Sequence, residues 1–169
     1  RQADYPSHLF ILRLADAPSR PILTVGVSVR DAAGAHELAP WLPDRAPVEH
    51  HPGASLLIAE QQGGDSDAGE PTGYEELLWV RTLLYAGVWI ESLAASGAAA
   101  RTALVREAVN RAMARDLDEV GAMVPVGDVE WREAMRAAGF QSLGEFVWMV
   151  ARLPLPGLAR ESAVDAAGA

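Results

Sequence analysis

The stretch of residues 88–126 constrains the fold of this chain more than any other. It contains an apolar run at 88–94, a loop of small residues, a long amphipathic segment and a second apolar run at 120–126. In the amphipathic segment Leu104 and Ala108 stand four residues apart, and arginines and other polar residues fill the opposite arc, which is the pattern of a half-buried helix. The stretch therefore predicts a strand, a long helix and a second strand.

The junction between the first strand and the helix is a candidate anion site. A strand that enters a helix through a tight loop of small residues leaves free N–H groups and the positive end of the helix dipole at one place. Phosphates and other anions bind at such places.

Composition excludes several classes of protein. Half of the 169 residues are hydrophobic and 22% are charged, which favours one folded domain over a disordered chain. The absence of cysteine excludes disulfides and a cysteine nucleophile. No apolar run reaches the roughly 18 residues of a membrane span, and we expect a cytoplasmic protein without a membrane partner. A net charge of −9 disfavours nucleic acid and favours cationic partners.

Apolar periodicity and capping signals predict the remaining elements. Asp128 and Gly139 are the expected start and stop signals of a short helix. The predicted strands are residues 9–14, 22–29, 55–60 and 73–85, and a buried final strand at 145–153. Two further helices are predicted, at residues 32–42 and 129–138. The first of them would be about three turns long, with Pro40 near its end.

We divide the chain into an N-terminal strand or arm at residues 1–21, a main domain at 22–153 and a flexible tail at 154–169. The sequence of residues 10–15, Phe-Ile-Leu-Arg-Leu-Ala, is echoed by Met-Val-Ala-Arg-Leu-Pro at 149–154. The echo leaves two interpretations open. The N-terminal run is either the last strand of a preceding copy in a tandem protein or, as we prefer, an added edge strand or the arm of a homodimer.

The ordered set of elements resembles the GNAT superfamily of N-acetyltransferases. The resemblance rests on five segments and covers roughly residues 22–153. Residues 26–39 are similar to the opening strand and helix of the family. Residues 90–94 and 102–108 are similar to the cofactor strand and the helix that follows it. Ala-Met-Arg-Ala-Ala-Gly-Phe at 134–140, followed by residues 146–149, is similar to the closing helix and strand. The resemblance implies an α/β fold with a mixed central sheet, flanking helices and splayed central strands.

The same resemblance implies acetyl-CoA, or another acyl-CoA, as cofactor. In the superfamily the pantetheine pairs with the cofactor strand and the pyrophosphate rests on the loop before the helix. Carried over to this chain, the cofactor-binding residues are Leu93, Ala94 and Ala95 on the strand, and Gly97, Ala99, Ala100, Arg101 and Thr102 in and after the loop. The phosphate loop is degenerate, because Ala99 and Arg101 occupy its two glycine positions and the loop is shorter than usual.

Acetyl transfer to an amine requires a base for the amine and is often helped by an acid for the departing thiolate. Many relatives place a tyrosine where this chain has Met135. Glu91 is our candidate base, because a carboxylate in an otherwise apolar strand should have a raised pKa. It could equally be a structural carboxylate paired with an arginine. Tyr85 and Tyr74 are candidate acids, with ordinary packing as the alternative for each.

The sequence thus favours an acetyl-CoA-dependent N-acetyltransferase that acts on a cationic small amine or a peptide amine. One alternative is a GNAT-like binding or assembly module without catalysis, in which Met123 or Arg101 would fill the space between the splayed strands. Another is a transferase that uses a different acyl thioester. No Gly-x-Ser-x-Gly motif supports a hydrolase, and the pair His50-His51 lacks a third ligand, so we expect no metal site.

Overall fold

A computed structural model describes residues 6–17, 25–41, 53–62, 69–83 and 86–147. In chain order the elements are strand β1 (Ser7–Arg13), 3₁₀ helix η1 (Leu14–Asp16), β2 (Val27–Asp31), 3₁₀ helix η2 (Ala35–Trp41), β3 (Ser55–Gln61), β4 (Glu70–Arg81), β5 (Ala86–Ala95), helix α1 (Ala98–Ala114), β6 (Glu119–Pro125), helix α2 (Val129–Ala137) and β7 (Gln141–Phe146). The predicted strand, helix and second strand at 88–126 are therefore confirmed as β5, α1 and β6.

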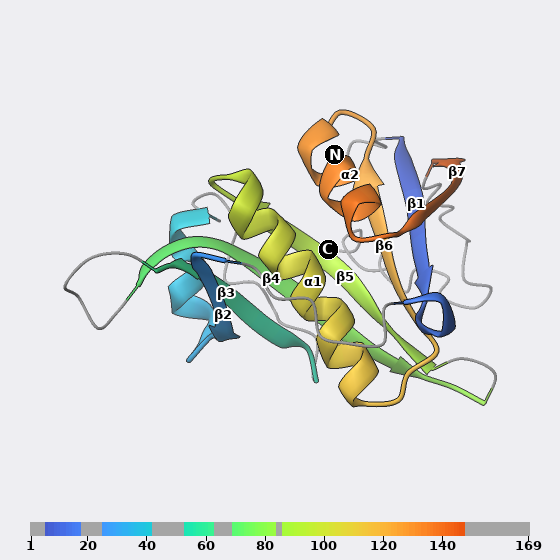
Figure 1. Cartoon of the computed structure of the whole chain (residues 1–169), viewed down its shortest axis with the longest axis horizontal. Coiled ribbons are helices and arrows are strands. Elements are labelled where there is room, and N and C mark those ends of the chain that lie inside the picture. Colours follow the sequence, from blue (N-terminus) through green and yellow to red (C-terminus); the bar gives the residue numbers. More distant parts are fainter. Residues whose placement is uncertain (1–5, 18–24, 42–52, 63–68, 84–85, 148–169) are drawn as a thin grey trace, which may run out of the picture.

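The strands form one mixed sheet in the order β2-β3-β4-β5-β6-β1-β7. Only β5 and β6 are parallel neighbours, and every other adjacent pair is antiparallel. Helices α1 and α2 lie side by side over the same face of the sheet (Figure 1). The architecture confirms the predicted α/β fold with a mixed central sheet and flanking helices.

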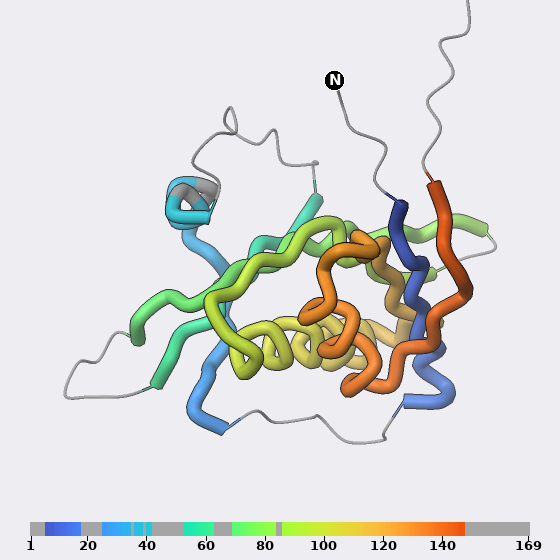
Figure 2. The backbone as a smooth tube through the Cα atoms, turned by 90° about the horizontal axis from the view of Figure 1, so that it is seen from above, coloured from blue at the N-terminus to red at the C-terminus, as the bar shows by residue number. Residues whose placement is uncertain are grey.

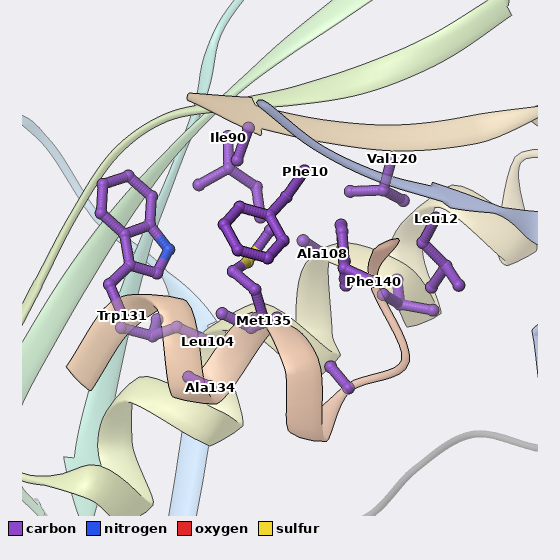
Figure 3. Close-up of a cluster of buried hydrophobic side chains, with 14 of the residues drawn as sticks. Phe10, Leu12, Ile90, Leu104, Ala108, Val120, Trp131, Ala134, Met135 and Phe140 are labelled. Atoms are coloured by element: carbon purple, nitrogen blue, oxygen red, sulfur yellow. The ribbon is translucent and has the colours of Figure 1, made fainter. Parts of the chain in front are cut away.

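The main hydrophobic core lies between the two helices and the sheet. Leu104 and Ala108 of α1 are fully buried against it, as the four-residue spacing predicts. From the sheet side, Phe10 and Ile90 point towards Met135 of α2, and none of these three side chains is exposed (Figure 3). Strands from the start and the middle of the chain thus contribute to one core.

The opposite face of the sheet carries η2 at one end, where Leu38 packs with Ile58 and Tyr74. Towards the other end the Trp89 ring lies across Gly121. A Cβ atom at Gly121 would stand 2.6 Å from the Trp89 ring, so only glycine fits beneath this side chain. Among the described residues, no helix is long and apolar enough to cross a bilayer.

The signals for helix α2 are confirmed. The Asp128 side chain accepts a hydrogen bond from the Trp131 backbone N–H at 2.9 Å, as expected of an N-cap. Gly139 follows the helix with a φ of 91°, a left-handed conformation that favours glycine.

Four predicted elements differ from the structure. The strand expected at 22–29 begins at Val27 within the described residues. The three-turn helix expected at 32–42 is the shorter 3₁₀ helix η2, which contains Pro40; the missing proline N–H opposes a regular α-helix. A buried strand was expected at 145–153; the structure instead has β7 at 141–146 with all of its residues exposed, and 148–153 lie outside the described residues. The N-terminal run, which we expected as an added edge strand or arm, forms β1 in the interior of the sheet, between β6 and β7.

Candidate active site

The two central parallel strands separate part of the way along their length. β5 and β6 pair only from Gly87 and Glu119 to Ile90 and Ala122. Beyond these pairs β5 continues to Ala95, and β6 continues past the last pair as well, without a ladder between them. Figure 1 shows the two ribbons diverging towards the end where α1 begins. The predicted splay of the central strands is present, and the facing backbone edges of β5 and β6 are free of each other there.

A β-bulge lies where the two strands begin to separate. Leu77 of β4 pairs with Ile90, but its neighbour Glu76 pairs with Ser92, so Glu91 is the extra residue. Its side chain is exposed, and the apolar surroundings expected from the sequence are not found. The bulge explains the difference, because an inserted residue breaks the alternation of side chains that the expectation assumed.

The backbone positions predicted to hold pantetheine lie on the diverging part of β5. Leu93, Ala94 and Ala95 are half-buried, and on the other side of the strand they pair with Glu75, Tyr74 and Gly73 of β4. This diverging part of β5 is therefore paired along one edge only. Leu93, Ala94 and Ala95 are followed directly by the start of α1, so the residues predicted to bind pantetheine and those predicted to bind the pyrophosphate are adjacent in the chain.

Helix α1 begins without a side-chain cap. Gly97 is the N-cap residue, and the first turn contains no acidic side chain. A Cβ atom at Gly97 would meet nothing within 4 Å, so the space beside the helix start is open. The four unpaired N–H groups of a helix start and its positive dipole end favour an anion.

A pocket of about 350 Å³ lies between the start of α1 and helix α2. Its lining residues are Ser96, Gly97, Ala98, Arg101 and Thr102 at the α1 end, and Glu130, Glu133, Ala134 and Ala137 of α2. The pocket thus contains most of the predicted phosphate-binding residues. Ala99 is exposed beside it and Ala100 is buried in the core.

Arg101 is the cation of this pocket, and its side chain is only 10% exposed. One guanidinium nitrogen donates to the Ala95 carbonyl at 3.1 Å, and another contacts the Glu130 carboxylate at 2.8 Å. The Glu130 side chain is 72% exposed, so it can move into solvent and release the guanidinium. Arg101 therefore links the end of β5 to α2 while it remains able to exchange its anionic partner.

Glu75 is the residue that sequence reasoning missed. It is fully buried on β4, between Leu57 of β3 and Leu93 of β5 in the sheet register. Neither carboxylate oxygen has a hydrogen-bond partner in the described part of the chain. Burial raises the pKa of the Glu75 carboxyl well above its usual value; the Glu107 carboxylate adds to the rise, and Arg111 opposes it. The sequence contains a signal for it. Glu75 and Glu76 are consecutive, and because consecutive residues of a strand face opposite sides of the sheet, one of the two had to face the helices.

Arg111 does not neutralise Glu75, because two other carboxylates hold it. Its Nε donates to Glu107 at 2.8 Å, and its Nη1 donates to Asp31 of β2 at 2.6 Å. This hydrogen bond lowers the pKa of the Asp31 carboxyl. The Arg111 guanidinium thus connects α1 to the edge strand β2, and in the described structure the Glu75 carboxyl has no ion pair.

Of the two tyrosines considered as acids, the structure describes only Tyr74. Tyr74 is buried on the face that packs against η2, where its ring lies 6.0 Å from that of Trp41. Tyr85 lies outside the described residues. Met123, named for the binding-module alternative, is half-buried on β6. Glu91 and the residues around Arg101 are therefore the described candidates at the splay.

No protein-family model matches the chain, and no curated protein matches it in sequence. Solved structures do. A GCN5-related N-acetyltransferase from Sphaerobacter thermophilus is 19% identical with a TM-score of 0.53, covering 86% of this chain and 51% of that chain. A GCN5-related N-acetyltransferase from Anabaena variabilis is 15% identical with a TM-score of 0.55, covering 86% and 39%.

The tandem GNAT protein of the clavulanic acid biosynthesis pathway is 11% identical with a TM-score of 0.58, covering 87% of this chain and 53% of that chain. The chain spans about half or less of the length of these three structures. At such identities the likeness concerns architecture, and it agrees with the mixed sheet and the separation of β5 from β6 described above. The chain has the fold of the GCN5-related N-acetyltransferases.

Proposed function

We propose that the protein is an N-acetyltransferase that transfers the acetyl group of acetyl-CoA to an amine. The observation that carries the proposal is the separation of β5 from β6 beside the uncapped start of α1. The free backbone groups of β5 can pair with the amides of a ligand, and the N–H groups at the start of α1, next to them, can bind its anionic part. Coenzyme A contains these two parts in this order, because its pantetheine amides are followed by a pyrophosphate.

The described residues fit such a molecule at both ends. The backbone groups of Leu93, Ala94 and Ala95 would hold the pantetheine amides, and the free N–H groups of residues 97–100 would hold phosphate oxygens, since the Arg101 N–H already donates to the Gly97 carbonyl. Open space at Gly97 leaves room for a phosphate. Arg101 would contribute a charge-assisted contact once it releases Glu130.

The thioester supplies an activated acetyl group, and the protein must supply orientation and proton transfer. A neutral amine nitrogen attacks the thioester carbonyl carbon, a C–N bond forms, and the C–S bond breaks to release the thiolate. Glu91, exposed at the bulge, is the proposed acceptor of the ammonium proton, directly or through a water molecule. A net charge of −9 favours a cationic small amine or a peptide amine as acceptor.

One observation favours a second candidate function, a GNAT-fold binding module without catalysis. Two carboxylates, Glu130 and Glu133, line the pocket that would receive phosphates, and one of them already pairs with Arg101. A third candidate, a transferase for a thioester that lacks the nucleotide, needs only the β5 contacts. We prefer the acetyl-CoA enzyme to the binding module because the Glu130 side chain is 72% exposed, so its contact with Arg101 is open to competition by a phosphate.

Thermal unfolding with different thioesters separates the three candidates. Saturating acetyl-CoA should raise the melting temperature, since a ligand that binds only the folded state stabilises it. S-acetylpantetheine, which lacks the nucleotide, should do so less. Equal shifts by both would support the third candidate. No shift by either, together with no acetylation of a panel of amines, would leave the binding module.

A further inference from the structure

A buried hydrogen-bond donor lies on the helix side of the sheet, without an acceptor in the described structure. Trp131, in the first turn of α2, is only 5% exposed. Its indole Nε1–H group has no hydrogen-bond partner in the described part of the chain. Buried donors in folded proteins are nearly always paired, because an unpaired one costs free energy. This N–H group is therefore a candidate contact for a bound molecule.

The course of the chain places Trp131 beside the gap between β5 and β6. β6 ends at Pro125 and α2 begins at Val129, so the first turn of α2 follows closely on the diverging end of β6. Figure 2 shows α1 and α2 on the same side of the strands. Ala134, about one turn after Trp131, lines the pocket at the start of α1. Trp131 thus lies on the helix side of the candidate site, one turn from its pocket.

The indole nitrogen faces the row of the sheet at which the two strands begin to separate. Ile90 and Ala122 are the last paired residues of β5 and β6, and on its other side Ala122 pairs with Phe10 of β1. Trp131 belongs to the same core cluster as these three residues. Figure 3 shows its ring rising from α2 with the nitrogen on the side of Phe10. The Nε1–H group is therefore directed towards the row where the gap opens.

The direction of the ligand in the proposed site brings its acyl end to the same row. With its pyrophosphate at residues 97–100 and its pantetheine amides along residues 93–95, the ligand runs backwards along β5 from the start of α1. Its acyl group then lies next to the bulge at Glu91 and the last ladder residue, Ile90. A positioned N–H donor stabilises the negative charge that develops on a carbonyl oxygen under attack. The thioester thus presents an acceptor where the indole presents a donor.

We propose that the Trp131 Nε1–H group donates a hydrogen bond to the carbonyl oxygen of the bound acyl thioester, which makes Trp131 a further catalytic residue. The inference rests on the proposed function. When the amine nitrogen attacks the carbonyl carbon, the electron pair of the C=O bond moves to the oxygen, and the indole stabilises this charge while keeping its proton. The electron pair then returns, the C–S bond breaks, the thiolate leaves, and the ammonium proton passes to Glu91.

Trp131→Phe removes the N–H group and keeps an aromatic ring in the core. The matched control is Trp79→Phe, because the Trp79 Nε1–H group donates to the Ser55 hydroxyl at 2.8 Å and Trp79 pairs with Val88, where β5 and β6 are still joined. Trp131→Phe should lower kcat for amine acetylation about 100-fold, while the Kd of CoA, measured by calorimetry, is unchanged. Trp79→Phe should change neither. An unaltered kcat in Trp131→Phe, or equal losses in both variants, overturns the proposal.

The side-chain N–H signals of the five tryptophans give a readout in the unmodified protein, and substitution of one tryptophan at a time identifies each signal. Saturating acetyl-CoA should shift the Trp131 signal, and CoA, which lacks the acyl carbonyl, should shift it much less. Backbone shifts along β5 without a shift of the Trp131 signal, or equal shifts of that signal by both ligands, overturn this inference and leave the proposed function standing. No shift of any signal by acetyl-CoA overturns both.

Discussion

Replacing Glu75 by glutamine should stabilise the protein, and the gain should grow as the pH rises. The carboxyl is fully buried on β4 between two leucines, and in the described structure neither oxygen has a hydrogen-bond partner. Its pKa is raised well above the usual value, mainly by burial. The folded protein therefore keeps the Glu75 proton at pH values where the unfolded chain has released it.

The sign and size of the effect follow from linkage. Where the folded state binds more protons than the unfolded state, the free energy of unfolding falls as the pH rises. The fall begins near the unfolded pKa of glutamate, about 4.3, and ends at the raised folded pKa. Within that window each pH unit changes the unfolding constant about tenfold, which is about 1.4 kcal/mol. Glutamine has no charge to desolvate, so the Glu75→Gln protein lacks this fall.

Urea unfolding at several values between about pH 5 and about pH 8 measures the difference directly. The matched control is Glu70→Gln, an exposed carboxylate on the same strand, which should change stability by only a few tenths of a kcal/mol at every pH. A Glu75→Gln stability difference that stays constant with pH, or that shrinks as the pH rises, would refute the reasoning about the buried carboxyl.

Three further outcomes test the site and the core. Glu91→Gln should lower kcat for amine acetylation by about 100-fold or more while acetyl-CoA binding, followed by calorimetry, is unchanged; an unaltered rate removes its role as base. Arg101→Gln should weaken acetyl-CoA binding and Glu130→Gln should strengthen it by up to about fivefold, because the Glu130 carboxylate competes with phosphate for the Arg101 guanidinium; a change of affinity in the same direction in both variants would contradict this competition. Phe10→Ala should cost about 3 to 5 kcal/mol in urea unfolding, whereas Leu143→Ala, 57% exposed on β7, should cost less than about 1 kcal/mol; equal costs would show that β1 is not part of the core.

The central part of the fold is predictable from the sequence, because it rests on local periodicity. The strand, helix and strand of residues 88–126 and the cap at Asp128 follow from apolar spacing and from side chains that bond their own backbone. The place of β1 in the sheet is different. A strand's pattern reports that one face is buried, but it does not report which strands lie beside it.

The site shows the same division between local and long-range information. That a helix follows β5 is a local property, and it is predicted correctly; the helix begins at Ala98, however, within the residues expected to form the phosphate loop. The exposure of Glu91 depends on a bulge that exists only relative to β4, and the burial of Glu75 depends on which face of β4 meets α1. Neither relation is present in the spacing of one strand, so the sequence predicts the wrong surroundings for Glu91 and gives Glu75 no role.

The central claim is that the separating ends of β5 and β6, with the start of α1, receive an acyl thioester. Backbone amide NMR during a titration with acetyl-CoA tests it most directly. The account predicts that the largest shifts fall on Leu93, Ala94 and Ala95, on residues 97–102, and on the diverging end of β6. Saturation without shifts at these amides, or the absence of any shift at millimolar acetyl-CoA, would contradict it.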